Sequence, residues 1–166
     1  MKYLTKPLVL AFVFVPLFVF VSALVHAARG LPGKVFAEVL PENIQWAPFP
    51  AFPPSARLAV LVGDTSTNSP YVVRVKVPDG VKLMPHRHPE DRIYTVMSGV
   101  FYIGIGDKFA ADKLKAYPPG SVVVLPGNTP HFHWAKSGEY VTQVTANGPL
   151  GIDYVNPNDD PRKGAP

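Results

Sequence analysis

Short runs of apolar residues, separated by turn-forming segments, dominate the chain from residue 56 onward. The runs are rich in Val, Ile, Tyr and Thr, and read ARLAVLV, YVVRVKV, VKLM, RIYTVMSG, VFYIGIG, SVVVLPG, HFHWA, EYVTQVTA and LGIDYV. Runs of this composition, bounded by segments such as GDTSTNSP, PDG, PPG and GNTP, are typical of β-strands. The only helical pattern is short, AADKLKA at residues 110–116. Many short strands with regular turns predict an all-β sandwich or barrel.

The N-terminal segment has a different pattern. Two lysines precede an apolar run over residues 8–25, and small residues follow up to Ala27. This is the pattern of a secretory signal peptide. An uncleaved membrane anchor is the alternative, because the run is long enough to span a bilayer. Pro16 and the small residues favour cleavage, so we predict a signal peptide over residues 1–27, cleavage after Ala27, and a periplasmic or secreted protein with no membrane contact thereafter.

The ends of the predicted domain lack strand patterns. The proline-rich stretch LPENIQWAPFPAFPPSA predicts an extended arm over residues 28–55. The barrel is then expected over residues 56–156. The last segment, NPNDDPRKGAP, has no apolar periodicity, and we expect a flexible tail over residues 157–166. The chain that remains after cleavage has the size of one domain.

Charge and cysteine content narrow the possible functions. The chain has 16 basic and 12 acidic residues, and two of the lysines lie in the predicted signal peptide. So small an excess of positive charge does not favour nucleic acid or an anionic membrane as partner. There is no cysteine, which excludes disulfides and thiolate ligands. Any metal must therefore be held by imidazole and oxygen.

The histidines suggest a metal site. Apart from His26 in the predicted signal peptide, they form two H-x-H pairs, His86/His88 and His131/His133. Residues two apart on a strand share one face, so each pair can present two imidazoles to one side of a sheet. Converging imidazoles bind Fe, Mn, Ni, Cu or Zn. Polar-face or core histidines are the alternative, but the pairing of all four favours a metal.

At these histidines the sequence resembles the cupin superfamily. GVKLMPHRHPEDRIYTVMSG is similar to the first cupin motif, and GSVVVLPGNTPHFHWA to the second. The matching positions are Gly80, His86, His88, Gly99, Gly120, Pro126 and His131. The resemblance covers residues 80–135. It implies a cupin-type double-stranded β-helix, or jelly-roll barrel, and a divalent transition metal held by His86, His88 and His131.

The chain departs from the cupin pattern at three positions. Arg92 stands where the first motif has a glutamate. Asn128 replaces a glycine of the second motif, and asparagine tolerates the positive φ that a glycine would supply there. Ala135 stands in place of an asparagine. The first departure matters most, because a guanidinium group has only donors and cannot bind a metal.

Three arrangements are compatible with Arg92 at this position. Glu90 or Asp91 supplies the missing carboxylate, or His133 acts as a fourth nitrogen ligand. In the third, the metal keeps three imidazoles, and Arg92 pairs with Glu90 or Asp91 or clamps a substrate carboxylate. We favour the third, with His133 supporting the ligands or acting as general base. Five residues are candidates for lining the cavity, although aromatic residues on strands usually pack in the core: Tyr94, Tyr102, Phe132, Trp134 and Gln143.

These features predict an exported, metal-binding cupin that acts on a small organic molecule as a metal-dependent, dioxygenase-like enzyme. His133, Arg92 and Glu90 are the candidate catalytic residues. The alternative is a non-catalytic module that binds a small molecule or anion, with a structural metal or none. Cupins often form dimers, and the arm over residues 28–55 can reach a neighbour, so a homodimer is possible.

Overall fold

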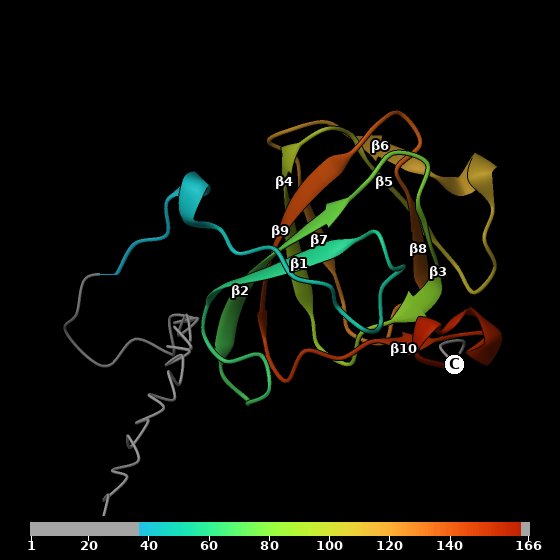
Figure 1. The fold of residues 1–166 in the computed structure, drawn as a ribbon. Coiled ribbons are helices and arrows are strands. Elements are labelled where there is room, and N and C mark those ends of the chain that lie inside the picture. The colour runs from blue at the N-terminus through green and yellow to red at the C-terminus, as the bar shows by residue number, and fades with distance from the viewer. Residues whose placement is uncertain (1–36, 164–166) are drawn as a thin grey trace, which may run out of the picture.

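Ten strands form two antiparallel sheets in the computed structural model, which describes residues 37–163. The strands are β1 (Arg57–Val62), β2 (Pro70–Val77), β3 (Lys82–Arg87), β4 (Arg92–Ser98), β5 (Phe101–Ile105), β6 (Lys115–Tyr117), β7 (Val122–Leu125), β8 (His131–Trp134), β9 (Tyr140–Asn147) and β10 (Asp153–Tyr154). One five-stranded sheet has the order β1-β2-β9-β4-β7, and the other has the order β10-β3-β8-β5-β6 (Figure 1). The predicted all-β class is confirmed, and each apolar run quoted above overlaps a strand.

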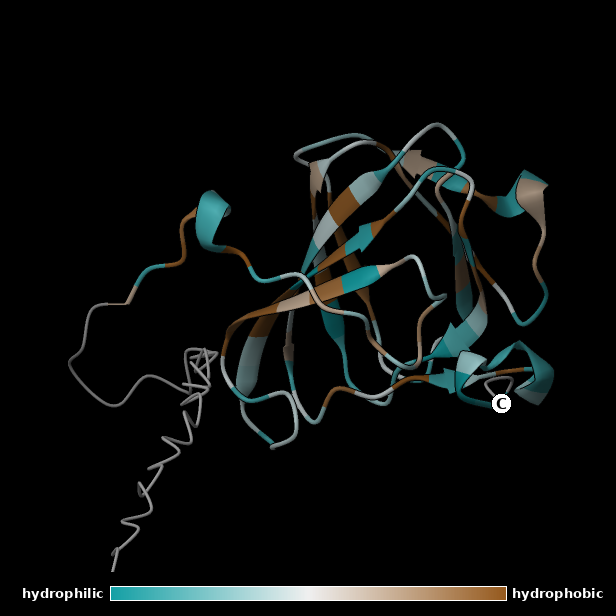
Figure 2. Ribbon diagram, in the orientation of Figure 1, coloured by the Kyte–Doolittle hydropathy of each residue, from teal (hydrophilic) through white to brown (hydrophobic). Residues whose placement is uncertain are grey.

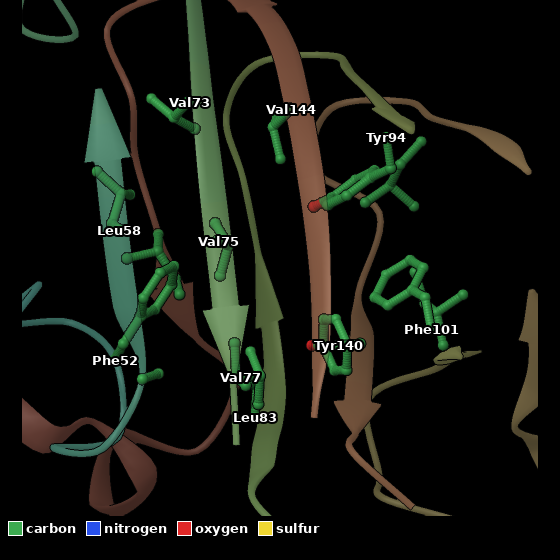
Figure 3. Close-up of a cluster of buried hydrophobic side chains, with 14 of the residues drawn as sticks. Phe52, Leu58, Val73, Val75, Val77, Leu83, Tyr94, Phe101, Tyr140 and Val144 are labelled. Carbon is green, nitrogen blue, oxygen red and sulfur yellow. The ribbon is translucent and has the colours of Figure 1, made fainter. Parts of the chain in front are cut away.

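Alternating burial along the strands explains how the two sheets enclose a core. In β2, Tyr71, Val73, Val75 and Val77 are buried, while the residues between them are partly exposed. This period of two places one face of the strand inside. Figure 2 shows the resulting mixture of hydrophobic and polar positions along the strands. The inward side chains of both sheets meet in one cluster, part of which Figure 3 shows.

Two turns depend on residues with a positive φ. Asn128 has a φ of 59°, as predicted for its place in the second motif. Its backbone N–H donates to the His88 carbonyl at 2.6 Å, which ties the turn before β8 to the end of β3. Gly99 has a φ of +67°, and an added Cβ atom would lie 2.1 Å from the carbonyl oxygen of Glu139. Only glycine fits between β4 and β5 at this point.

The helix predicted over residues 110–116 is wrong. The structure has a single 3₁₀ turn, η2 (Ala111–Lys113), followed by the short edge strand β6. Residues of β6 pair with β5, Tyr102 opposite Ala116. A helix of so few residues is marginal, and pairing with β5 satisfies the backbone instead.

The arm packs against the barrel from Ala47 onward, whereas residues 37–43 are exposed. The arm contains a 3₁₀ turn, η1 (Pro41–Asn43), then pairs Ala47 with Leu58 and buries Ala51 and Phe52. The end of the chain forms two 3₁₀ turns, η3 (Pro157–Asp159) and η4 (Pro161–Lys163).

The second of these turns is anchored by Arg162, which binds Asp160 and donates to the carbonyl of Ile152. The predicted signal peptide, the first part of the arm (28–36) and residues 164–166 lie outside the described residues. Over residues 37–163, no helix has the length and apolar character needed to cross a membrane.

Candidate metal centre

Two neighbouring strands bring the four histidines together inside the barrel. His86 lies on β3 and His88 one residue beyond its end, while His131 and His133 lie on β8. The two strands are antiparallel, and His86 stands directly opposite His131. The ring centroids are 4.3 Å apart for His86 and His131, and 5.0 Å for His131 and His133. Each H-x-H pair thus turns both imidazoles to the interior.

Three of the histidines form the tightest group. Potential ligand nitrogens of His86, His131 and His133 all lie within 4.8 Å of one another. The Nε2 atoms of these residues are buried, and none has a hydrogen-bond partner within residues 37–163. Leaving such atoms unsatisfied costs about 1–3 kcal/mol each. A cation between them would accept their lone pairs, so the three nitrogens fit a metal ion.

His88, which the cupin resemblance places among the ligands, lies beside this group. Its ring centroid is 4.9 Å from that of His86 and 4.9 Å from that of His131. Its Nδ1 atom bonds to the carbonyl of Gly151 at 2.7 Å. The predicted set and the tightest group therefore share His86 and His131, and differ in whether His88 or His133 is the third member.

Backbone carbonyls fix the tautomers of the two shared histidines. Nδ1 of His86 lies 2.7 Å from the carbonyl oxygen of Met84, and Nδ1 of His131 lies 2.9 Å from that of Thr129. A carbonyl oxygen can only accept, so each Nδ1 carries the proton and each Nε2 carries a lone pair. This is the orientation that metal-binding histidines usually have.

Burial keeps all four imidazoles neutral. Loss of solvent lowers the pKa of His131 to about 4, from an ordinary value of 6.5. It also lowers the pKa of His86, His88 and His133 well below 6.5, and the Arg92 guanidinium acts in the same direction. At neutral pH the imidazoles therefore need not lose a proton before they bind a metal. A set of neutral imidazoles suits Zn, Fe, Mn, Ni or Cu.

Arg92 forms a buried ion pair with Glu90. The Arg92 side chain is 4% exposed, and its Nε donates to Glu90 Oε1 at 3.0 Å, while Nη2 reaches the same oxygen. The carboxylate also accepts from the Tyr71 hydroxyl at 2.7 Å and from the N–H of Gly151 at 3.3 Å. Of the arrangements compatible with the sequence, the structure shows the Arg92–Glu90 pair. These contacts hold the carboxylate away from the role of a metal ligand.

The ion pair is connected to the histidines through one carbonyl. The Gly151 oxygen accepts from Arg92 Nη2 at 3.0 Å and lies 2.7 Å from His88 Nδ1. Asp91, the other acidic candidate, is exposed and accepts from the N–H of Gly127 at 2.6 Å. Arg92 and His88 therefore share the Gly151 carbonyl, whereas Asp91 contacts the turn at Gly127 instead.

Replacing Glu90 with glutamine is expected to destabilise the fold by about 3–5 kcal/mol, because it leaves the buried Arg92 charge without its partner. Urea unfolding of the two proteins measures this difference. Glu139→Gln is the matched control, since Glu139 is exposed and the change should stay within about 0.5 kcal/mol. Equal effects of the two substitutions would show that the pair does not hold the barrel together.

A narrow cavity lies next to the histidines and has room for about one water molecule. Its walls come from both sheets and from the arm: Phe52, Val75, Leu83, His86, His88, Arg92, Tyr94, His133, Tyr140, Thr142 and Val144. Of the five residues predicted to line a cavity, Tyr94 does so. Phe132 and Trp134 instead pack against Phe109, with ring centroids 5.0 Å and 6.2 Å apart.

Sequence reasoning missed six of the lining residues: Phe52, Val75, Leu83, Tyr140, Thr142 and Val144. Tyr140 and Thr142 lie on the inward face of β9. The alternation in EYVTQVTA could have placed them there, because Val144 shares that face. Phe52 comes from the arm, and its local sequence gives no sign that it reaches the interior.

Comparisons with known proteins show that the two-sheet barrel is a known fold. No protein-family model matches the chain, and a search of curated proteins also finds no match. The polyketide cyclase RemF from Streptomyces resistomycificus aligns with a TM-score of 0.61 at 16% identity, over 78% of this chain and 92% of RemF. An RmlC-like cupin protein from Ralstonia eutropha aligns with a TM-score of 0.57 at 18% identity, over 75% of this chain and 74% of the other. The protein has a cupin fold.

A third similar structure is the DMSP lyase DddQ from Ruegeria pomeroyi, with a TM-score of 0.54 at 20% identity, covering 66% of this chain and 60% of DddQ. At such identities the likeness extends to the fold. The cupin-type barrel expected from the two motifs is confirmed, and some structures with this fold are enzymes.

Proposed function

We propose that this cupin-fold protein is an exported, metal-dependent enzyme that acts on a small organic molecule in a dioxygenase-like reaction. The observation that carries the proposal is the group of three buried, unpartnered Nε2 atoms of His86, His131 and His133. Export rests on the predicted signal peptide over residues 1–27.

All four imidazoles are proposed to hold the metal. His86 and His131 belong both to the predicted set and to the tightest group. His88 has its Nδ1 fixed by Gly151, which leaves its Nε2 free to bind. His133 has a buried and unpartnered Nε2, so its position favours a ligand over the general base expected from the sequence. When bound, the metal supplies a Lewis acid and, if it is a redox metal, electrons for chemistry with O₂.

The absence of a carboxylate from this ligand set favours an anionic substrate. Arg92 and Tyr71 occupy the Glu90 carboxylate, so neutral imidazoles alone would surround the cation and leave its positive charge uncompensated. An enol, phenol or carboxylate oxygen is the natural partner for such a charge.

Two tyrosines facing the cavity suit the same substrate. Burial raises the pKa of Tyr140 well above its ordinary value of 10, and it also raises the pKa of Tyr94. Both hydroxyls therefore keep their protons at neutral pH and can donate hydrogen bonds to a substrate oxygen. Tyr140 also lies against the centre, with its hydroxyl 3.4 Å from His133 Nδ1.

Metal analysis combined with oxygen uptake tests the proposal. Protein purified without a histidine tag should contain about one redox metal per chain and should consume O₂ with a phenolic or enol substrate. Removing the metal with a chelator should stop both uptake and turnover. Metal-dependent turnover without O₂ consumption would overturn the dioxygenase-like reaction.

The alternative function, a non-catalytic binding module, predicts a different experimental result. The narrow cavity favours it, because there is room for about one water molecule beside the histidines. A small anion would then raise the melting temperature of the protein, and the shift would persist after chelation. For the enzyme we propose, the shift should disappear together with the metal.

A further inference from the structure

The walls of the cavity come almost entirely from strands. Val75 lies on β2, His86 on β3, Tyr94 on β4, His133 on β8 and Thr142 on β9, all within paired sheets. Apart from His88, which directly follows β3, Phe52 is the one lining residue within 37–163 that does not lie on a strand. Widening the cavity through a sheet would break strand pairing, whereas moving Phe52 outward would not.

The segment that carries Phe52 makes few hydrogen bonds to the barrel. Over residues 48–55, prolines at 48, 50, 53 and 54 have no N–H group, so this stretch cannot pair as a strand. Its hydrogen bonds to other elements come from two side chains. Tyr154 donates to the carbonyl of Ala51 at 2.8 Å, and Arg57 donates to the carbonyl of Pro54 at 2.7 Å.

Phe52 lies just beneath the surface of the molecule. Its side chain is 5% exposed, while Pro50 and Pro54 on either side are exposed. Figure 3 shows Phe52 next to Leu58 and Val75, with its ring directed from the arm toward the core. The segment is flanked by Ala47, which exchanges two backbone hydrogen bonds with Leu58, and by the buried Ala56, which directly precedes β1. It can therefore move outward as a flap between two fixed points.

We infer that Phe52 is the gate to the histidine cluster, and that outward movement of residues 48–55 admits the metal and the substrate. The inference deepens the proposed function and rests on it, because it names the residue that sets the size of what reaches the centre. A planar molecule of about the size of one benzene ring would take the place of the Phe52 side chain. Larger molecules would need the whole segment to stay displaced.

The gate can be tested without turnover, by measuring how fast the histidines react. Diethyl pyrocarbonate acylates neutral imidazoles, and mass spectrometry gives the modification rate at His86, His131 and His133 in the metal-free full-length chain. We expect Phe52→Ala to raise this rate about tenfold, as a lowering of the opening free energy by about 1.4 kcal/mol would do. The uptake of Co²⁺ by the same proteins should accelerate in parallel.

Phe109→Ala is the matched control, since Phe109 is a half-buried loop phenylalanine outside the cavity lining, and its rates should equal those of the wild type. Tyr154→Phe keeps the ring beside His86 but removes the hydrogen bond to Ala51, and it should give an intermediate rate. If Phe52→Ala fails to fold, the rate in Tyr154→Phe still tests the gate. Rates in Tyr154→Phe and Phe52→Ala that match the wild type would overturn the gate. A chain that reacts faster but never binds Co²⁺ would contradict the metal centre and leave the gate standing.

Discussion

Replacing His86 with alanine is expected to abolish metal retention. The His86 ring lies within 4.3–5.3 Å of the other three imidazole rings, as measured between centroids, so its loss removes a ligand from the middle of the site. Metal content per chain is measured by mass spectrometry after dialysis of tag-free protein against a weak chelator. Wild-type protein should keep about one metal per chain, and His86→Ala less than about a tenth of that.

The His133→Ala variant is the comparison for His86→Ala. If all four imidazoles bind, removing His133 leaves three ligands, and metal retention should fall only partly. Thermal melting of the metal-free variants checks that both remain folded. Equal metal content in wild type and His86→Ala would contradict the assignment of the site to these histidines.

Acid is expected to unfold the metal-free protein near pH 5. In the unfolded chain the four histidines bind protons below their ordinary pKa of 6.5, whereas burial lowers the pKa of each in the fold, to about 4 for His131. The stability is therefore fully present above pH 6.5 and falls as the pH drops toward 4. Each such histidine contributes up to about 1.4 kcal/mol per pH unit. Four of them would remove up to about 6 kcal/mol per pH unit, a large part of the 5–15 kcal/mol typical of a domain.

Urea unfolding at several pH values between 7 and 5 measures this slope. A His88→Gln variant, which has one titrating group fewer, should show a slope smaller by about 1.4 kcal/mol per pH unit. A stability that stays constant between pH 7 and pH 5 would mean that the imidazoles are already protonated in the fold, or that they are exposed to water. Either result would contradict a cluster of neutral ligands.

Local sequence patterns predicted much of the architecture. Strand positions followed from period-two runs such as YVVRVKV, where the buried residues are Tyr71, Val73, Val75 and Val77. The positive φ of Asn128 followed from its place in the second cupin motif. The prediction failed at residues 110–116, where helical propensity was outweighed by pairing of β6 with β5.

The candidate site, too, was predicted only in part from the sequence. The H-x-H spacing showed that each pair of histidines shares a strand face, and the two motifs implied that the pairs meet. The sequence did not show which nitrogens come closest, because His133 joins His86 and His131 only through the register of β8 against β3. Nor did the sequence decide which acidic residue pairs with Arg92. Glu90 and Asp91 are adjacent in the chain, and the path of the folded backbone decides which of them faces Arg92.

The sequence by itself determined the all-β class, most of the strand positions and the identity of the metal-binding candidates, because these depend on residues close together in the chain. The tertiary structure decided the neutrality of the imidazoles, the burial of the Arg92–Glu90 pair and the position of Phe52 over the cavity. Each of these depends on solvent exclusion by segments far apart in sequence. Gly151, for example, reaches both His88 and Arg92 from about 60 residues away.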